Sequence, residues 1–307
     1  MKLEEVFKNL RKMESENYEN TETFEGAPVE KINRDDPGSR EFHGYVYFVD
    51  GVMKNLAIGR YRGFPLVLSQ IAIGSVRIRV GEDPEIIPDY SSKLILSLNE
   101  NVFGDMPKEL DFDDFKVFVL VTKSSDPTEA VRSMMEEEEM KLAKEIAKSH
   151  PESIVLKDGT LRPIYEVPEE PVFVHKSGPF GLVKNVIDVI GVRELYTEIS
   201  QLARGRRTKA FKKVYKNQYV QLSTFVKLME GEDEFVRVDA VHENENLEDI
   251  LPVFDEIAWI VENLSIPYKI KRYPQNLPVI EYLESFLRAH LLDPRYVVSR
   301  IRSSVLP

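Results

Sequence analysis

Apolar and β-branched residues dominate residues 42 to 80, in short blocks that predict β-strands. The blocks read FHGYVYFVDG, VMKNLAIGRY and FPLVLSQIAIGSVRIRV, with short connections at Asp50-Gly51 and at 60–63. Short connections between consecutive strands are typical of antiparallel pairs. The pattern therefore predicts an antiparallel meander of three strands, with a bend or bulge in the third at Gly74.

A strand–helix–strand segment is predicted next. The run FKVFVLVT at 115–122 has the composition of a strand, and a helix follows with Asp126 as N-cap and Pro127 in its first turn. The next strand, SIVLKD, ends at Asp158. A parallel crossover is the expected connection between these two strands.

The remaining elements fit one mixed α/β domain over residues 41–307. Residues 1–40 are predicted to be an amphipathic helix over 1–18 and a polar, irregular extension. The later pattern predicts a hairpin at 172–184 turning at Gly178-Pro179, a helix at 192–202, strands at 219–229, 234–241 and 268–272, and helices at 247–264, 277–291 and 294–304.

Composition excludes several classes of protein. The 307-residue chain contains no cysteine, so disulfides, thiolate zinc sites and cysteine nucleophiles are excluded. It has no GxxxxGK[ST] loop for ATP, no apolar signal segment and no apolar run of transmembrane length, so a cytoplasmic protein without a membrane partner is expected. The net charge of −11 disfavours general attraction to nucleic acid, which would need a local basic patch or bound metal ions.

Acidic residues occur where they could form a site. Asp50 and Asp158 each follow a short apolar strand and precede a glycine, although Asp-Gly can also simply make a turn. On the helix after Asp126, the apolar stripe passes through Glu138 and Glu139, so one of them faces inward. An inward carboxylate is costly unless it pairs with a lysine or binds a cation.

Glu281 lies in the first turns of a later helix, where the helix dipole alone could explain it. Three or four of these carboxylates at one sheet edge would bind Mg²⁺ or Mn²⁺, which prefer oxygen ligands. Two such ions can activate a water and stabilise both oxygens in phosphodiester displacement.

A basic run over 204–216 stands out in this acidic chain. Phe211 and Tyr215 are interleaved with its cations, which suits a single nucleic-acid strand, although an exposed linker or a docking surface would have the same composition. The candidate DNA contacts are Arg204, Arg206, Arg207, Lys209, Lys212 and Lys213.

Several short motifs occur in a specific order along most of the chain. They are FVDG at 48–51, the glutamate-bearing helix, LKDGTL at 156–161, GLVKN at 181–185, FVRVDA at 235–240 and YPQNLPVIE at 273–281. With these motifs the chain resembles the NurA family of DNA-end-processing nucleases, as a thermophilic bacterial member.

The resemblance implies an RNase H-like fold, in which an antiparallel meander of three strands precedes parallel strands flanked by helices. It also implies a manganese-dependent deoxyribonuclease that degrades DNA from 5′ to 3′ and cuts single strands internally. The implied partners are single- and double-stranded DNA, a second copy of the chain and a hexameric HerA-type translocase that acts in end resection.

By this resemblance Asp50 and Asp158 are metal ligands from two strands, and Glu139 is the helical ligand, with Glu138 as the alternative. Glu281 stands where family members tend to carry an Asp or His as the last ligand.

Lys184 matches a lysine that could contact the scissile or a neighbouring phosphate. The chain departs from the family at Asp239, where a glutamate is common, and in the helix after Glu281.

Two other functions fit parts of this pattern. The chain could be an RNase H-like scaffold that docks on a translocase and has no chemistry of its own. A glycosidase with a carboxylate pair is a weaker alternative, because the single tryptophan gives little for sugar stacking.

Overall fold

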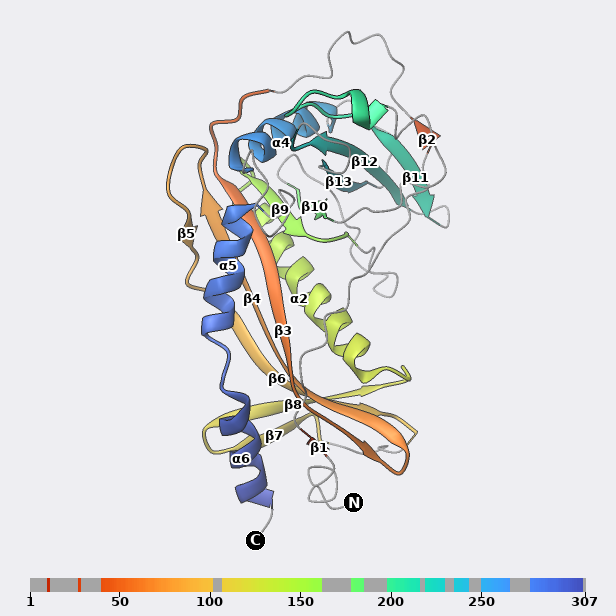
Figure 1. The fold of residues 1–307 in the computed structure, drawn as a ribbon, viewed down its shortest axis with the longest axis vertical. Helices are drawn as coiled ribbons and strands as arrows, with labels where there is room; N and C mark the ends of the chain where they lie inside the picture. Colours follow the sequence, from red (N-terminus) through yellow and green to blue (C-terminus); the bar gives the residue numbers. More distant parts are fainter. Residues whose placement is uncertain are drawn as a thin grey trace.

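The computed structural model describes residues 10–11, 27–28, 40–101, 107–161, 178–184, 198–215, 219–229, 235–242, 250–265 and 277–305. The described strands form one mixed sheet in the order β2-β11-β12-β13-β10-β9-β3-β4-β6-β8-β7 (Figure 1). Their bounds are β2 Ala27–Pro28, β3 Val46–Tyr61, β4 Phe64–Ile78, β6 Ser91–Asn99, β7 Glu109–Phe112, β8 Phe115–Thr122, β9 Ile154–Asp158, β10 Phe180–Val183, β11 Phe211–Tyr215, β12 Tyr219–Lys227 and β13 Phe235–His242. Two short strands, β1 (Leu10–Arg11) and β5 (Glu85–Ile86), pair with β3 and β4.

The centre of the sheet combines antiparallel and parallel pairs. Strands β3, β4 and β6 form an antiparallel meander, whereas β9 runs parallel to β3 and β10 runs parallel to β9. Strand β8 runs parallel to β6 on the other side. The predicted α/β class, with a meander followed by parallel strands, is therefore confirmed.

The meander differs from the prediction in its first connection. Asp50-Gly51 is not a turn, because β3 is one strand of 16 residues in which Asp50 pairs with Gly74 and Gly51 with Ile73 on β4. The turn lies at Arg62 and Gly63, which both have positive φ. The third meander strand is β6, and the irregularity predicted at Gly74 lies in β3 instead, between Asn55 and Ala57.

Four described helices were predicted close to their observed bounds: α2 (Pro127–Ser149), α4 (Leu251–Leu264), α5 (Pro278–Ala289) and, at the C-terminal end, α6 (Pro294–Val305). Asp126 caps α2 by accepting hydrogen bonds from the backbone N–H groups of Thr128 and Glu129, as predicted. The predicted helix over 1–18 is wrong at Leu10–Arg11, which pair with β3 as a strand. The described residues leave out most of the predicted helix over 1–18, residues 172–177 of the predicted hairpin, residues 192–197 of the predicted helix at 192–202, and the predicted strand at 268–272.

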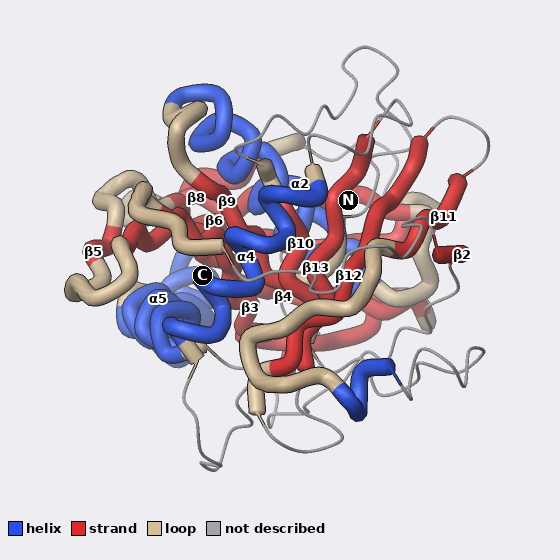
Figure 2. Tube along the Cα trace, turned by 90° about the horizontal axis from the view of Figure 1, so that it is seen from above, coloured by secondary structure: helices blue, strands red, loops and turns tan. Residues whose placement is uncertain are grey.

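Helices cover both faces of the sheet (Figures 1 and 2). Alternate residues of β3 point to opposite faces, so Tyr47 and Val49 pack on Ala143 and Ala147 of α2. The residues between them pack in the main core with α4 and α5 on the other face. Asp50 therefore belongs to the face that α5 covers.

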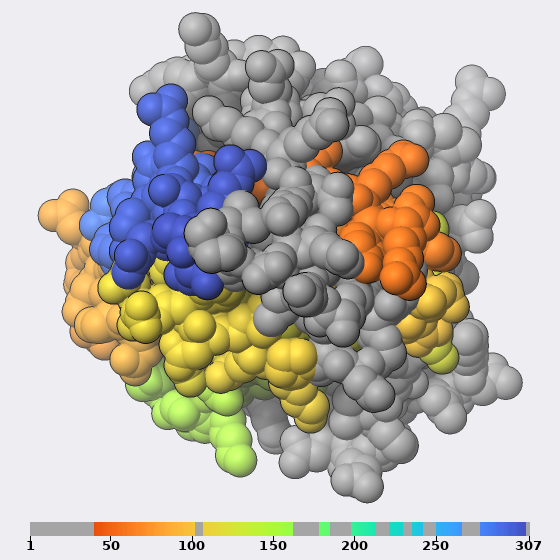
Figure 3. All heavy atoms as spheres, turned by 90° about the horizontal axis from the view of Figure 1, so that it is seen from below, coloured from red at the N-terminus to blue at the C-terminus, as the bar shows by residue number. Residues whose placement is uncertain are grey.

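At the far end of the sheet, α6 lies against the region of β7 and β8 (Figure 3). Val297 and Ile301 of α6 belong to one buried cluster with Leu110, Phe112 and Val117 of this hairpin. None of the helices in the described ranges combines the length and apolarity needed to cross a membrane.

Candidate metal centre

Asp50 and Asp158 lie side by side where the parallel ladder of β3 and β9 ends. The last pair of that ladder joins Val49 to Lys157, and each aspartate follows its strand's member of the pair. Neighbouring parallel strands present their next residues at the same edge of the pairing, on the same face. The sequence reasoning thus identified both aspartates correctly as neighbours, although Asp50 lies within a strand and not at its end.

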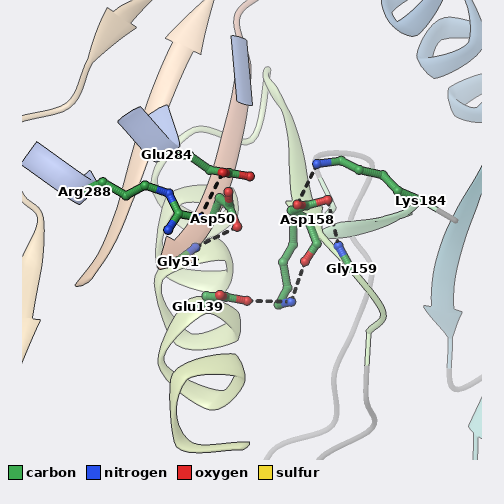
Figure 4. Close-up of polar contacts among 9 residues, drawn as sticks. Asp50, Gly51, Glu139, Asp158, Gly159, Lys184, Glu284 and Arg288 are labelled. Carbon is green, nitrogen blue, oxygen red and sulfur yellow. Dashed lines mark hydrogen bonds and ion pairs between the residues drawn. The ribbon is translucent and has the colours of Figure 1, made fainter. Parts of the chain in front are cut away.

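Glycine at position 74 allows helix α5 to approach Asp50. Gly74 pairs with Asp50, and a Cβ atom on Gly74 would lie 3.1 Å from Leu287 Cδ2 of α5 and 3.3 Å from Tyr90 Cβ. The close packing brings Glu284 of α5 to the two aspartates (Figure 4). One carboxylate oxygen from each of Asp50, Asp158 and Glu284 lies within 4.8 Å of the others, and these three residues are called the acidic group below.

The carboxylate of Asp50 is buried, and its hydrogen bonding is incomplete within the described residues. Only 6% of Asp50 is exposed; its Oδ1 accepts a hydrogen bond of 2.8 Å from Gly51 N, but Oδ2 has no hydrogen-bond partner among the residues that the structure describes. Burial and the charge of Asp158 raise the pKa of Asp50 well above its usual range, against the influence of Lys184. An acidic group with a free, buried oxygen fits a divalent cation that prefers oxygen ligands, such as Mg²⁺ or Mn²⁺.

Lys184 follows β10 and reaches the acidic group on the α5 face. Its Nζ atom donates a hydrogen bond of 2.7 Å to Asp158 Oδ2, while Asp158 Oδ1 accepts one of 3.1 Å from Gly159 N. Burial disfavours the charged amine, but Asp158 and Asp50 outweigh this effect and raise the pKa of Lys184. Lys184 is therefore an ammonium ion beside the carboxylates.

Glu139 reaches the same region from the α2 face. It is 3% exposed, and a Cβ atom on Gly51 would lie only 2.5 Å from its Oε1 atom, so the glycine makes room for it. The Nζ atom of Lys157 lies 2.8 Å from Glu139 Oε2 and donates a hydrogen bond of 2.7 Å to the Asp158 carbonyl (Figure 4). Burial raises the pKa of Glu139, although Lys157 opposes this.

These contacts decide which glutamate of α2 turns inward. Glu138 pairs with Lys93 at 2.8 Å and with Lys141 at 3.3 Å near the surface, whereas Glu139 is buried. Glu139 is therefore the inward glutamate, and its predicted role as a metal ligand stays a prediction. The alternative prediction, that the inward glutamate pairs with a lysine, is confirmed by the contact of Glu139 with Lys157. Glu139 is not part of the acidic group.

The residue from α5 differs from the predicted one. Glu281 is not part of the acidic group, and Glu284, one helical turn later, takes this place. The signal was present in the sequence, because the buried residues Ile280, Leu283 and Leu287 form a stripe that runs closer to position 284 than to 281. Glu284 also lies 3.3 Å from Arg288 through its Oε2 atom.

Two arginines of the basic run make hydrogen bonds to other parts of the protein. Arg207 is fully buried, and its Nε atom donates a hydrogen bond of 2.7 Å to Asp255 of α4, so the predicted DNA contact is wrong at this position. Arg204 donates to the carbonyl oxygens of Leu228 (3.1 Å) and Glu262 (2.9 Å).

The other cations of the run differ in surroundings. Lys209 lies 4.0 Å from Glu198, and Arg206, Lys209 and Lys212 are partly exposed. Only the backbone of Lys213 is described, as part of β11. Their contact with DNA stays a prediction.

Asp239 is buried on β13, pairs with Arg237 at 2.9 Å and is not part of the acidic group. A comparison with protein-family models finds no match, and a comparison with curated proteins finds no relative.

Proposed function

We propose that this protein is a divalent-metal-dependent deoxyribonuclease of the NurA type. The observation that carries the proposal is the buried Asp50 Oδ2 atom, which has no hydrogen-bond partner in the described part of the chain although it belongs to a group of three converging carboxylates. A cation would compensate the cost of this arrangement, and a carboxylate-bound cation beside a lysine is suited to a phosphodiester.

The strand order supports an RNase H-like fold for this domain. In the order β6-β4-β3-β9-β10, the first three strands along the chain form the meander, and the next two are added parallel beside the first. This is the arrangement implied by the family resemblance. It explains why the aspartates of the first and fourth of these strands adjoin.

Each residue has a role in the proposed reaction. Asp50, Asp158 and Glu284 would hold Mn²⁺ or Mg²⁺, which when bound activates water and stabilises the charge on the phosphate oxygens. Lys184 supplies a positive charge on the same face for a phosphate of the substrate.

Glu139 and Lys157 support the backbone of Asp158 from the α2 face. DNA ends, a second copy of the chain and a HerA-type translocase are the partners that we propose from the family resemblance.

End-labelled single- and double-stranded DNA, incubated with Mn²⁺ with and without a chelator, tests the proposal. We expect cleavage that the chelator abolishes and that Asp50→Asn or Asp158→Asn reduces by at least about 100-fold, because both change metal ligands. Glu138→Gln is the matched control, since Glu138 is a paired carboxylate outside the acidic group, and it should cleave like the wild type.

Wild-type rates in both aspartate variants would refute the nuclease. Mn²⁺ binding without cleavage of any DNA substrate would instead favour the inactive scaffold.

A further inference from the structure

Two lysines lie against the carboxylates, and their partners differ. Lys157, on the α2 face, is shared between Glu139 and the backbone carbonyl of Asp158, so both of its partners lie outside the set of metal-binding oxygens. Lys184 lies on the α5 face, and its hydrogen bond among the described residues goes to a carboxylate oxygen of the acidic group itself. Lys184 therefore competes with anything cationic that this group binds.

Both oxygens of Asp158 already accept hydrogen bonds, one from Lys184 and one from the backbone of Gly159. Asp50 offers an oxygen with no hydrogen-bond partner among the described residues, but the ammonium of Lys184 lies beside the acidic group, 2.7 Å from Asp158 Oδ2. The side chain of Lys184 is only 11% exposed, so little water surrounds its ammonium group to screen the charge.

We propose that Lys184 is a resident counter-ion of the acidic group, which keeps its affinity for a divalent cation low until a phosphate draws the ammonium away from Asp158. The proposal concerns metal binding by the free protein. Only its last clause rests on the proposed nuclease function. Lys184 thereby couples the binding of the cation to the binding of the phosphate.

The coupling follows from charge. An ammonium and a divalent cation repel each other at the shared carboxylate, so each weakens the binding of the other. The phosphodiester of a bound strand offers Lys184 another anionic partner and so removes this repulsion. By thermodynamic reciprocity, DNA must then tighten metal binding by the same factor as the metal tightens DNA binding.

The dissociation constant of Mn²⁺, measured by electron paramagnetic resonance on the full chain without DNA, tests the first step. Lys184→Met should bind Mn²⁺ at least about ten-fold more tightly than the wild type, a coupling of ordinary size. Lys184→Arg keeps the charge and should bind as weakly as the wild type. Lys93→Met removes a lysine paired with Glu138 outside the acidic group, and it should leave the constant unchanged.

A role of Lys184 in folding alone would predict weaker or unchanged binding in Lys184→Met, and that result would overturn the proposal. If the wild type binds Mn²⁺ and cleaves DNA but Lys184→Met binds no more tightly, only this inference fails. If neither protein binds Mn²⁺, both proposals fail.

The coupling is tested with a single-stranded oligonucleotide that carries phosphorothioate linkages, which resist cleavage. It should tighten Mn²⁺ binding by the wild type at least about five-fold and have a smaller effect on Lys184→Met. An equal effect on the two proteins would show that Lys184 does not couple the ligands.

Discussion

At the scale of single residues, the acidic group brings together carboxylates that repel one another electrostatically in the absence of a cation. Asp50 is buried and lies beside Asp158, and within the described ranges one of its oxygens has no hydrogen-bond partner. Glycines at 51 and 74 allow Glu139 and α5 to approach from the two faces. Such an arrangement lowers the stability of the metal-free protein, and the expected benefit is a preorganised site for a cation.

Asp50 should make the stability of the metal-free protein fall as the pH rises. Because burial and Asp158 raise its native pKa, the native state keeps a proton that the unfolded chain has lost above about pH 4. The free energy of unfolding therefore decreases as the pH rises through the elevated native pKa. Asp50→Asn does not titrate and should be more stable than the wild type at pH 7, by about 1–3 kcal/mol.

Urea denaturation of both proteins in a chelator, from pH 4 to pH 8, measures this difference. Mn²⁺ at 1,000 times the dissociation constant should reverse the order, because binding then adds about 4.1 kcal/mol to the wild type. Equal stability of the two proteins at every pH in the chelator would contradict the inferred burial of this charge.

At the scale of elements, the periodicity of α5 selects which glutamate reaches the acidic group. Glu281 and Glu284 lie one turn apart on the same helix, but only Glu284 shares the group with the two aspartates. The packing of Leu283 and Leu287 against Gly74 fixes the rotation of the helix on the sheet. The helix thus contributes the carboxylate of Glu284 to the acidic group and not that of Glu281.

Substituting these two glutamates tests that rotation. Glu284→Gln should weaken Mn²⁺ binding by at least about ten-fold, because a charged ligand is lost, whereas Glu281→Gln should change it less than about two-fold. Isothermal titration calorimetry with Mn²⁺ measures both constants. A loss in Glu281→Gln with none in Glu284→Gln would mean that the helix binds through its first turn, as the sequence had suggested.

Periodicity predicted the elements better than their connections. The strand at Asp158, the cap of α2 and the hairpin strands β12 and β13 were found, since each is governed by local pattern. The turn at Asp50-Gly51 was wrong, because pairing with β4 overrides a local turn signal. Strand β7 was missed because its four residues are too short for a periodic pattern.

The candidate site was only partly predictable for a similar reason. Strand residues such as Asp50 and Asp158 follow from alternation, but the choice of Glu284 depends on how α5 packs on Gly74. The pairing of Arg207 with Asp255 joins positions 48 residues apart, and a local basic composition cannot reveal it.

At the scale of the whole molecule, buried charge pairs join distant parts of the chain. Arg207 bridges to Val226 of β12 through its backbone and to Asp255 of α4 through its side chain. Arg207 thereby connects α4 to β12, the strand next to β13 in the sheet. The same run of cations contains Lys209, whose pairing with Glu198 is long and partly exposed.

Arg207→Met should destabilise the protein by about 3–5 kcal/mol, because Asp255 would stay buried without its counter-charge. Lys209→Met is the matched control and should change the free energy of unfolding by less than about 1 kcal/mol. Denaturant unfolding of the two variants measures the difference. Comparable small effects in both would indicate that Arg207 is as accessible as its neighbours.

Strand β3 has a consequence for how the protein opens. Its first half contributes Val46 and Phe48 to the main core, and its second half contributes Leu56 and Ala57 to the cluster beneath α6. One continuous strand therefore joins these two hydrophobic clusters, and Asp50 lies in its first half, where Val52 also packs in the main core. The amide hydrogens of Phe48 and Ala57, which are paired with β4 on either side of the irregularity, should exchange with deuterium only when both clusters open together, so the acidic group lies in the slowest-exchanging part of the described chain.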